Sequence, residues 1–150
     1  MSTYFPSSKT VEPKWYLVDA TDEILGRLAA RVAHLLRGKS RPHFTPFMDT
    51  GERVVVVNAA KVRFTGQKAE AKQYHYFTGF PGGIKSISLR DKMAKQPEEV
   101  VREAIQGMLP KNTHGRHLGA NLKVYRDAEH PHTAQQPEAV KLTKTRSATK

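Results

Sequence analysis

Apolar residues recur with helical spacing between residues 97 and 109. On a helix turning by about 100° per residue, one half of this segment is polar, and the other half comprises Val100, Val101, Ala104, Ile105, Met108 and Leu109. Pro97 suits the first position of a helix, whereas Pro110 cannot continue the ladder of backbone hydrogen bonds. The pattern therefore predicts a helix that begins at Pro97, ends before Pro110 and covers a core with one face.

A second amphipathic helix is predicted for residues 25–37. Its apolar side comprises Leu25, Leu28, Ala29, Val32, Leu35 and Leu36. Its opposite side carries three basic side chains at the spacing of one helical stripe, without an acidic residue among them, namely Arg27, Arg31 and His34. A third, shorter helix is predicted for residues 89–95, because Ser88 and Asp91 resemble a capping box.

A run of four valines marks the strand predicted for residues 53–58. A continuous β-branched run, unlike an alternating one, is typical of a strand that is covered on both faces. Shorter strands are predicted for residues 15–19 and 122–126. The patterns at 62–65 and 73–77 fit two more short strands, or one strand and a charged turn.

Strands that alternate with helices predict an α/β domain with a mainly parallel sheet between helices. A chain of 150 residues suits one core, so we expect a single domain. We predict an extended arm at 1–14, a core at 15–128 and, at 129–150, a Pro-rich arm with a basic tail.

Composition narrows the classes of partner. The chain has 25 Lys and Arg against 14 Asp and Glu, a pI near 10.0 and no cysteine. The absence of cysteine fits a reducing compartment and removes thiol catalysis and Cys-ligated zinc. Such a basic balance points to nucleic acid or to an anionic membrane, and the lack of any long apolar run makes the membrane the weaker case. We therefore expect a cytoplasmic protein that binds a polyanion.

The positive charge is concentrated in two stretches. Residues 24–48 contain five cations and no acid, and residues 106–125 also lack an acid. A solvated helix face is the ordinary explanation for a basic stripe, but here the charge continues into a basic loop. We predict nucleic-acid contacts at Arg27, Arg31, His34, Arg37, Lys39, Arg41, His43, Lys111, Asn112, His114, Arg116 and Lys123.

Aromatic residues alternate with cations between residues 68 and 85. This arrangement suits stacking on exposed bases, and we include Lys68, Lys72 and Tyr74 among the predicted RNA contacts. The alternative is that alternate aromatic residues form the buried face of a strand. Both interpretations remain open at this stage.

The sequence offers little support for catalysis, a cofactor or a metal. The glycines of the loop at 78–83 lack the Gly-Lys-Ser/Thr of a phosphate-binding loop, so they are interpreted as turn residues. His130 and His132 have no further ligands at metal-binding spacing. The rival hypotheses are a nucleotide-using α/β enzyme, which would bind a mononucleotide, and a DNA-compacting protein, which would bind duplex DNA and rRNA equally.

Several long motifs resemble one known family. They are DTGERVVVVNAAKVRFTGQK (49–68), GFPGGIKSISL (79–89), IQGMLPKN (105–112) and LKVYRDAEHPHTAQQPE (122–138). Together they resemble the bacterial form of the large-ribosomal-subunit protein thirteen family over residues 15–138. The resemblance implies a three-layer α/β/α sandwich around a four-stranded parallel sheet, and an early role in assembly. It also implies binding to large-subunit rRNA beside other ribosomal proteins, with no catalysis and no cofactor.

Overall fold

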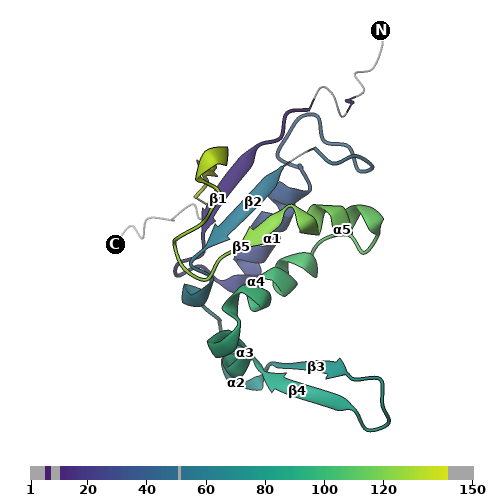
Figure 1. Ribbon diagram of the computed structural model, residues 1–150, viewed down its shortest axis with the longest axis vertical. Helices are drawn as coiled ribbons and strands as arrows, with labels where there is room; N and C mark the ends of the chain where they lie inside the picture. Colours follow the sequence, from purple (N-terminus) through teal and green to yellow (C-terminus); the bar gives the residue numbers. More distant parts are fainter. Residues whose placement is uncertain (1–5, 8–10, 51, 142–150) are drawn as a thin grey trace.

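The computed structural model describes residues 6–7, 11–50 and 52–141, and these form a mixed α/β structure (Figure 1). The strands are β1 (Trp15–Asp19), β2 (Arg53–Val57), β3 (Gln73–Phe77), β4 (Ile84–Ser88), β5 (Leu122–Val124) and β6 (Glu138–Ala139). The helices are α1 (Leu25–Leu36), α2 (Lys68–Ala71), α3 (Leu89–Lys95), α4 (Pro97–Gln106) and α5 (Thr113–Ala120). Two 3-10 turns, η1 (Ala59–Lys61) and η2 (Thr133–Gln135), complete the described elements.

Four strands form a parallel sheet in the order β5-β2-β1-β6. The valine strand β2 lies inside this sheet, where Val54 pairs with Tyr16 of β1 on one side and with Leu122 of β5 on the other. The four-stranded parallel sheet is therefore confirmed, and so is the prediction that the valines are covered on both faces, because all four are buried.

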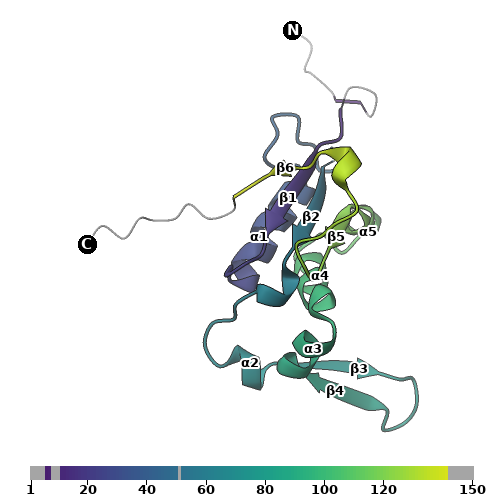
Figure 2. The ribbon, with the colours of Figure 1, turned by 60° about the vertical axis from the view of Figure 1, so that its left-hand side comes forward.

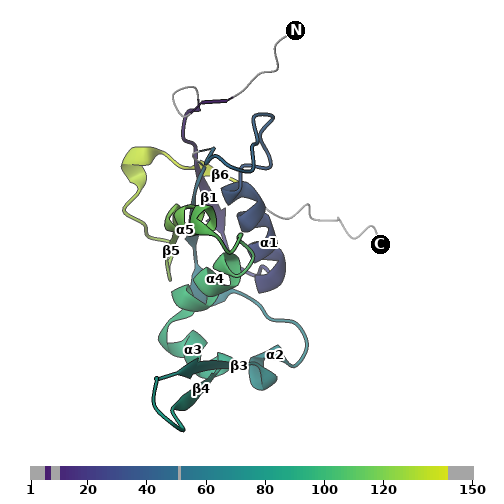
Figure 3. The same cartoon turned by 90° about the vertical axis from the view of Figure 1, so that its right-hand side faces the viewer.

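Helices α1 and α4 pack together on one face of the sheet (Figure 3). This face contributes Val54 and Val56 to a core that also contains Leu28 of α1 and Ile105 of α4. The side chains predicted for the apolar half of each helix are those that enter this core or its margin, apart from Met108, which is exposed. Amphipathic spacing was thus a sound guide to both helices.

The opposite face of the sheet lies under the segment that follows β5. Side chains alternate along a strand, so Trp15, which is two residues before Leu17, lies on the same face as the neighbouring Val55. The ring of Trp15 lies 5.1 Å from that of His132, between centroids, and the segment with η2 runs on the side of the sheet away from α1 (Figure 2). The four-stranded sheet is established, whereas the three-layer arrangement remains a prediction.

Strands β3 and β4 form a separate antiparallel hairpin that projects from the rest of the molecule (Figure 1). The loop predicted at 78–83 connects them, and α2 and α3 lie at the base of the hairpin. The predicted N-cap at Ser88 is confirmed, because the backbone N–H of Asp91 donates to Ser88 Oγ over 3.1 Å, and Ser88 Oγ in turn donates to Asp91 Oδ2. Residues 62–65 form no strand; their one sheet-like contact is an isolated bridge between Ile24 and Arg63.

Four of the described helices and strands, α2, β4, α5 and β6, were absent from the sequence prediction. Helix α5 occupies the stretch that was expected to be a basic loop after Pro110. Strand β6 pairs with β1, where Tyr16 lies opposite Glu138, so that the sheet includes residues beyond the expected core boundary at 128. The division into arms and core remains a prediction, and part of the N-terminal arm and the tail from 142 lie outside the described residues.

Candidate nucleic-acid interface

The basic stripe of α1 is exposed. Arg27, Arg31 and His34 lie on the side of the helix that faces away from the core, and α1 contains no acidic residue. Each of these side chains therefore meets solvent without an acidic neighbour on its own helix. An exposed row of this kind can contact the phosphates of a nucleic-acid backbone.

The loop after α1 continues this surface. Gly38, which ends the helix with φ +68°, is packed so closely that an added Cβ would lie 1.8 Å from Thr50 Oγ1. Lys39 and His43 beyond it are exposed, while Arg37 is half-buried. The glycine thus lets the chain turn sharply against the residues before β2 and carry the cations outward.

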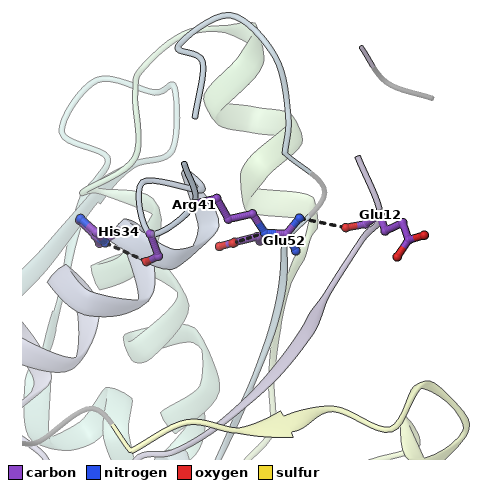
Figure 4. A network of polar contacts seen from close by, with 5 residues as sticks. Glu12, His34, Arg41 and Glu52 are labelled. Carbon is purple, nitrogen blue, oxygen red and sulfur yellow. Dashed lines mark hydrogen bonds and ion pairs between the residues drawn. The ribbon is translucent and has the colours of Figure 1, made fainter. Parts of the chain in front are cut away.

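Arg41 differs from the other predicted contacts because its guanidinium already has partners within the protein (Figure 4). Its Nε donates to Glu52 Oε1 over 2.8 Å, and its Nη1 donates to the carbonyl oxygen of Glu12 over 3.0 Å. Burial of Glu52 raises the pKa of its carboxyl group, although the charge and hydrogen bond of Arg41 act in the opposite direction. The RNA contact of Arg41 stays a prediction. In the structure its side chain joins the basic loop to Glu52 and Glu12.

The segment that follows β6 adds a cation that the sequence analysis did not place at this surface. Pairing of β6 with β1 continues in a hydrogen bond from the N–H of Val140 to the carbonyl oxygen of Leu17, 2.8 Å long. As a result, Lys141 lines a small cavity of about 210 Å³ together with Arg31 and His34. No sequence signal gave this contact, because Glu138 and Ala139 show no strand pattern.

A second basic surface lies where α5 meets the end of α4. Asn112 is the N-cap of α5, since its Oδ1 accepts a hydrogen bond from the N–H of Gly115 over 2.8 Å. Lys111 and Arg116 line a cavity of about 480 Å³ between the two helices. Lys111, Asn112 and Arg116 are exposed, whereas His114 is half-buried. The side-chain amide of Asn112 therefore caps α5, and its contact with RNA remains a prediction.

Lys123 lies elsewhere. It is the exposed middle residue of β5, between the buried Leu122 and Val124, and it pairs with Val55. Its side chain therefore leaves the sheet on the face opposite to α1 and α4. The structure does not bring Lys123 together with the stripe on α1.

The ring of Tyr74 is engaged by lysines of the same chain. The ammonium groups of Lys72 and Lys92 lie 4.7 and 4.3 Å from the centroid of the ring, and Tyr74 packs at the edge of the core. For this residue the structure favours the interpretation of a buried strand face. Lys68 and Lys72 are exposed and border a hollow of about 750 Å³ that is otherwise lined largely by apolar atoms, including those of Phe64.

The histidines near the C-terminus are engaged with aromatic neighbours. Tyr125 Oη lies 2.8 Å from His132 Nε2, and the rings of His130 and His132 are stacked with centroids 6.4 Å apart. Within the described ranges, no three His, Cys, Asp or Glu side chains are arranged to hold a metal ion. None of the described helices is both long and apolar enough to cross a membrane.

Comparisons with known proteins identify one family. The sequence profile of ribosomal protein L13 matches residues 13–131. The chain is 52% identical over 143 residues to the large ribosomal subunit protein uL13 of Magnetococcus marinus, an alignment that covers 95% of this chain and 99% of that protein. It is 51% identical over 142 residues to the uL13 proteins of Finegoldia magna and Pseudomonas aeruginosa, covering 95% of this chain in both cases and 99% and 100% of those proteins. A profile match over most of the chain, with such relatives aligned over nearly their full lengths, shows that the chain belongs to the ribosomal protein L13 family.

Proposed function

We propose that this chain is a structural, non-catalytic constituent of the large ribosomal subunit. In this role it binds large-subunit rRNA, lies beside other ribosomal proteins and takes part in early assembly. The observation that carries the proposal is the acid-free row of exposed cations on α1, which continues into the loop with Lys39 and is joined by Lys141. The names of the uL13 relatives agree with this role.

Binding would act mainly on the RNA backbone. Phosphates attract Lys and Arg without regard to sequence, and each counterion that they displace favours binding entropically. The surface of α1 is rigid because its other side is fixed in the core, so it suits a site where RNA segments pack with fixed spacing. Recognition of A-form RNA by shape and backbone needs no side chain that reads a base edge.

The finer architecture belongs to the same proposal. We infer that the segment at 125–137, with the single turn η2, takes the place of the third layer in the predicted three-layer α/β/α sandwich. Support comes from the contact between the rings of Trp15 and His132 and from hydrogen bonds that join this segment to the end of β2. One of these is the 3.0 Å bond from the N–H of Asn58 to the carbonyl oxygen of Asp127.

The binding surfaces can be tested by charge reversal. Arg31→Glu and Lys111→Glu should each weaken binding to large-subunit rRNA, measured by filter binding, without changing the circular dichroism spectrum. Lys95→Glu is the matched control, because Lys95 is exposed on α3, outside the predicted surfaces, and the substitution changes the net charge equally. Equal binding by all three variants would refute the chosen surfaces.

Membership of the subunit needs a separate experiment. A tagged chain should co-sediment with large subunits when a bacterial lysate is fractionated on a sucrose gradient. If the chain stayed in the slowly sedimenting fractions while large subunits moved ahead, the ribosomal role would be wrong.

A further inference from the structure

The β3–β4 hairpin exposes large apolar side chains. Phe77 is 64% exposed, Phe80 73% and Ile84 68%. Exposed residues of this size, gathered on one projecting element, mark an interaction surface more often than a solvated one. The hairpin reaches away from both basic surfaces described above (Figure 1), so its apolar residues need their own explanation.

The two faces of the hairpin differ. Tyr74 lies opposite Ile87 on the face turned towards α3 and α4, and these two side chains help to line a cavity of about 450 Å³ against those helices. Phe77 lies opposite Ile84 on the other face, because side chains alternate along each strand. The core therefore accounts for Tyr74 but not for Phe77.

The turn holds Phe80 at the tip in a defined position. The N–H of Thr78 donates to the carbonyl oxygen of Gly83 over 3.0 Å, and the N–H of Gly83 donates to the carbonyl oxygen of Phe80 over 2.9 Å. Gly83 is closely packed, since an added Cβ would lie 2.1 Å from Thr78 Oγ1. A turn fixed in this way loses little conformational entropy when Phe80 meets a partner.

The charge of the hairpin indicates which partner it fits. No Asp or Glu occurs between Glu70 and Asp91, while Lys72, Lys85 and Arg90 are exposed cations. An element with exposed cations and exposed aromatic rings is complementary to a partner that has both negative charges and flat apolar surfaces. Unpaired RNA bases meet that description, because their phosphates attract the lysines and their faces stack on aromatic rings.

We propose that the tip of the β3–β4 hairpin binds a single-stranded segment of rRNA, with Phe77 and Phe80 stacking on unpaired bases and Lys85 on the backbone. This inference rests on the proposed function and adds a second mode of contact to it: α1 binds backbone and shape, whereas the hairpin binds bases. Among the aromatic residues that alternate with cations in this stretch, Tyr74 has its ring covered by Lys72 and Lys92, whereas the fold leaves Phe77 and Phe80 exposed.

The experiment compares single-stranded with paired RNA. The probes are an oligouridine and an RNA duplex with the same number of nucleotides, titrated with the full-length chain in fluorescence anisotropy. Phe77→Leu and Phe80→Leu keep the side chains apolar but remove the rings, so each should lower the affinity for oligouridine by about tenfold and leave duplex binding unchanged. Phe80→Trp should preserve or increase the affinity for oligouridine, and ultraviolet cross-linking should join Phe77 or Phe80 to uracil.

Ile84→Ala is the matched control, since Ile84 is as exposed as the phenylalanines but has no ring. It should leave the affinity for oligouridine within about twofold of wild type. A loss as large as that of Phe80→Leu, or equal losses for single-stranded and duplex RNA, would overturn base stacking. A third result would also overturn it. If Phe80→Leu bound RNA-free large-subunit proteins more weakly than wild type but bound oligouridine with the same affinity, the hairpin would dock on protein.

Failure of this inference can be separated from failure of the proposed function. If Arg31→Glu weakens binding to large-subunit rRNA while both leucine variants bind oligouridine as wild type does, the hairpin proposal is wrong and the rRNA-binding role stands. If Arg31→Glu has no effect and the leucine variants lose oligouridine, the hairpin proposal stands and the stripe on α1 is wrong.

Discussion

Arg41 Nε lies 2.8 Å from Glu52 Oε1, in an ion pair whose carboxylate side chain is fully buried (Figure 4). The same guanidinium holds the carbonyl oxygen of Glu12, so one side chain links the residue before β2 to the chain before β1. The second oxygen of Glu52 and Nη2 of Arg41 have no hydrogen-bond partner among the described residues. The pair thus fixes the basic loop at a cost in desolvation that its hydrogen bonds only partly offset.

Loss of one member of this pair should be costly. Arg41→Ala leaves a buried carboxyl group without its counter-charge, and we expect the free energy of unfolding to fall by about 3 kcal/mol. Lys39→Ala, two residues away but exposed, should change it by no more than about 0.5 kcal/mol. Urea denaturation followed by tryptophan fluorescence measures both, and similar small losses for the two variants would mean that the ion pair does not anchor the loop.

The raised pKa of Glu52 predicts a particular dependence on pH. Because burial raises this pKa above its ordinary value of 4.5, the folded protein keeps the proton at pH values where the unfolded chain has lost it. The resulting stabilisation is complete below pH 4.5 and is lost as the pH rises through the folded pKa. Wild type should therefore gain stability relative to Glu52→Gln as the pH falls from neutrality towards 4.5. If the difference in stability between wild type and Glu52→Gln stayed constant or shrank as the pH fell, the pKa of Glu52 would not be raised by burial.

Asp19 should behave in the opposite way. Burial acts to raise its pKa, but hydrogen bonds from Thr21 and Asn58 outweigh this effect and hold the pKa below its ordinary value of 3.8. Its contribution is therefore present above pH 3.8 and is lost as the pH falls through the folded pKa. Asp19→Asn should cost about 1 kcal/mol at pH 7, a small amount because the group is exposed. The difference should shrink as acid protonates the wild-type carboxylate, which denaturant titrations at several pH values can follow.

Alanine substitutions at two helical glycines should change the free energy of unfolding in opposite directions. At Gly115 an added Cβ would lie 1.7 Å from the backbone oxygen of Pro110, so Gly115→Ala must displace α5 and should cost about 2 kcal/mol. At Gly26 no atom lies within 4 Å of such a Cβ, and Gly26→Ala should stabilise α1 by about 0.5 kcal/mol. Thermal unfolding of both variants gives the signs, and a neutral Gly115→Ala would show that α5 is not held against Pro110.

The close approach at Gly115 also explains why α5 was absent from the sequence prediction. Its eight residues, Thr113–Ala120, include two glycines, which have poor helix propensity and indicate a loop when the segment is considered alone. In the fold the lack of a side chain at Gly115 allows the backbone of Pro110 to approach closely. Tertiary packing therefore outweighs local preference at this position.

Elements with a strong local pattern were predicted well, and so was the family. The four valines, the apolar faces of α1 and α4 and the cap at Ser88 all appear as expected, and the ribosomal protein L13 match confirms the resemblance drawn from the motifs. Strand β6 could not be predicted from the sequence, because a strand of two residues has no periodicity and its partner β1 is more than a hundred residues away in the chain. The same limit hid the approach of Lys141 to Arg31, which depends on that pairing.

The dependence of binding on salt should reveal which cations meet phosphates. Each phosphate neutralised on a duplex contributes about 0.9 to the slope of log affinity against log salt concentration. Arg31→Ala should therefore reduce the slope for large-subunit rRNA by about one and weaken binding at low salt. Arg41→Lys offers a contrast. The guanidinium of Arg41 is held by Glu52 within the protein and therefore displaces few counterions when RNA binds. The salt slope of Arg41→Lys should stay near that of wild type, although lysine cannot reproduce the hydrogen bonds that hold the loop. Titrations at four or more salt concentrations distinguish the two, and a larger change for Arg41→Lys than for Arg31→Ala would mean that the loop, and not the stripe on α1, carries the phosphate contacts.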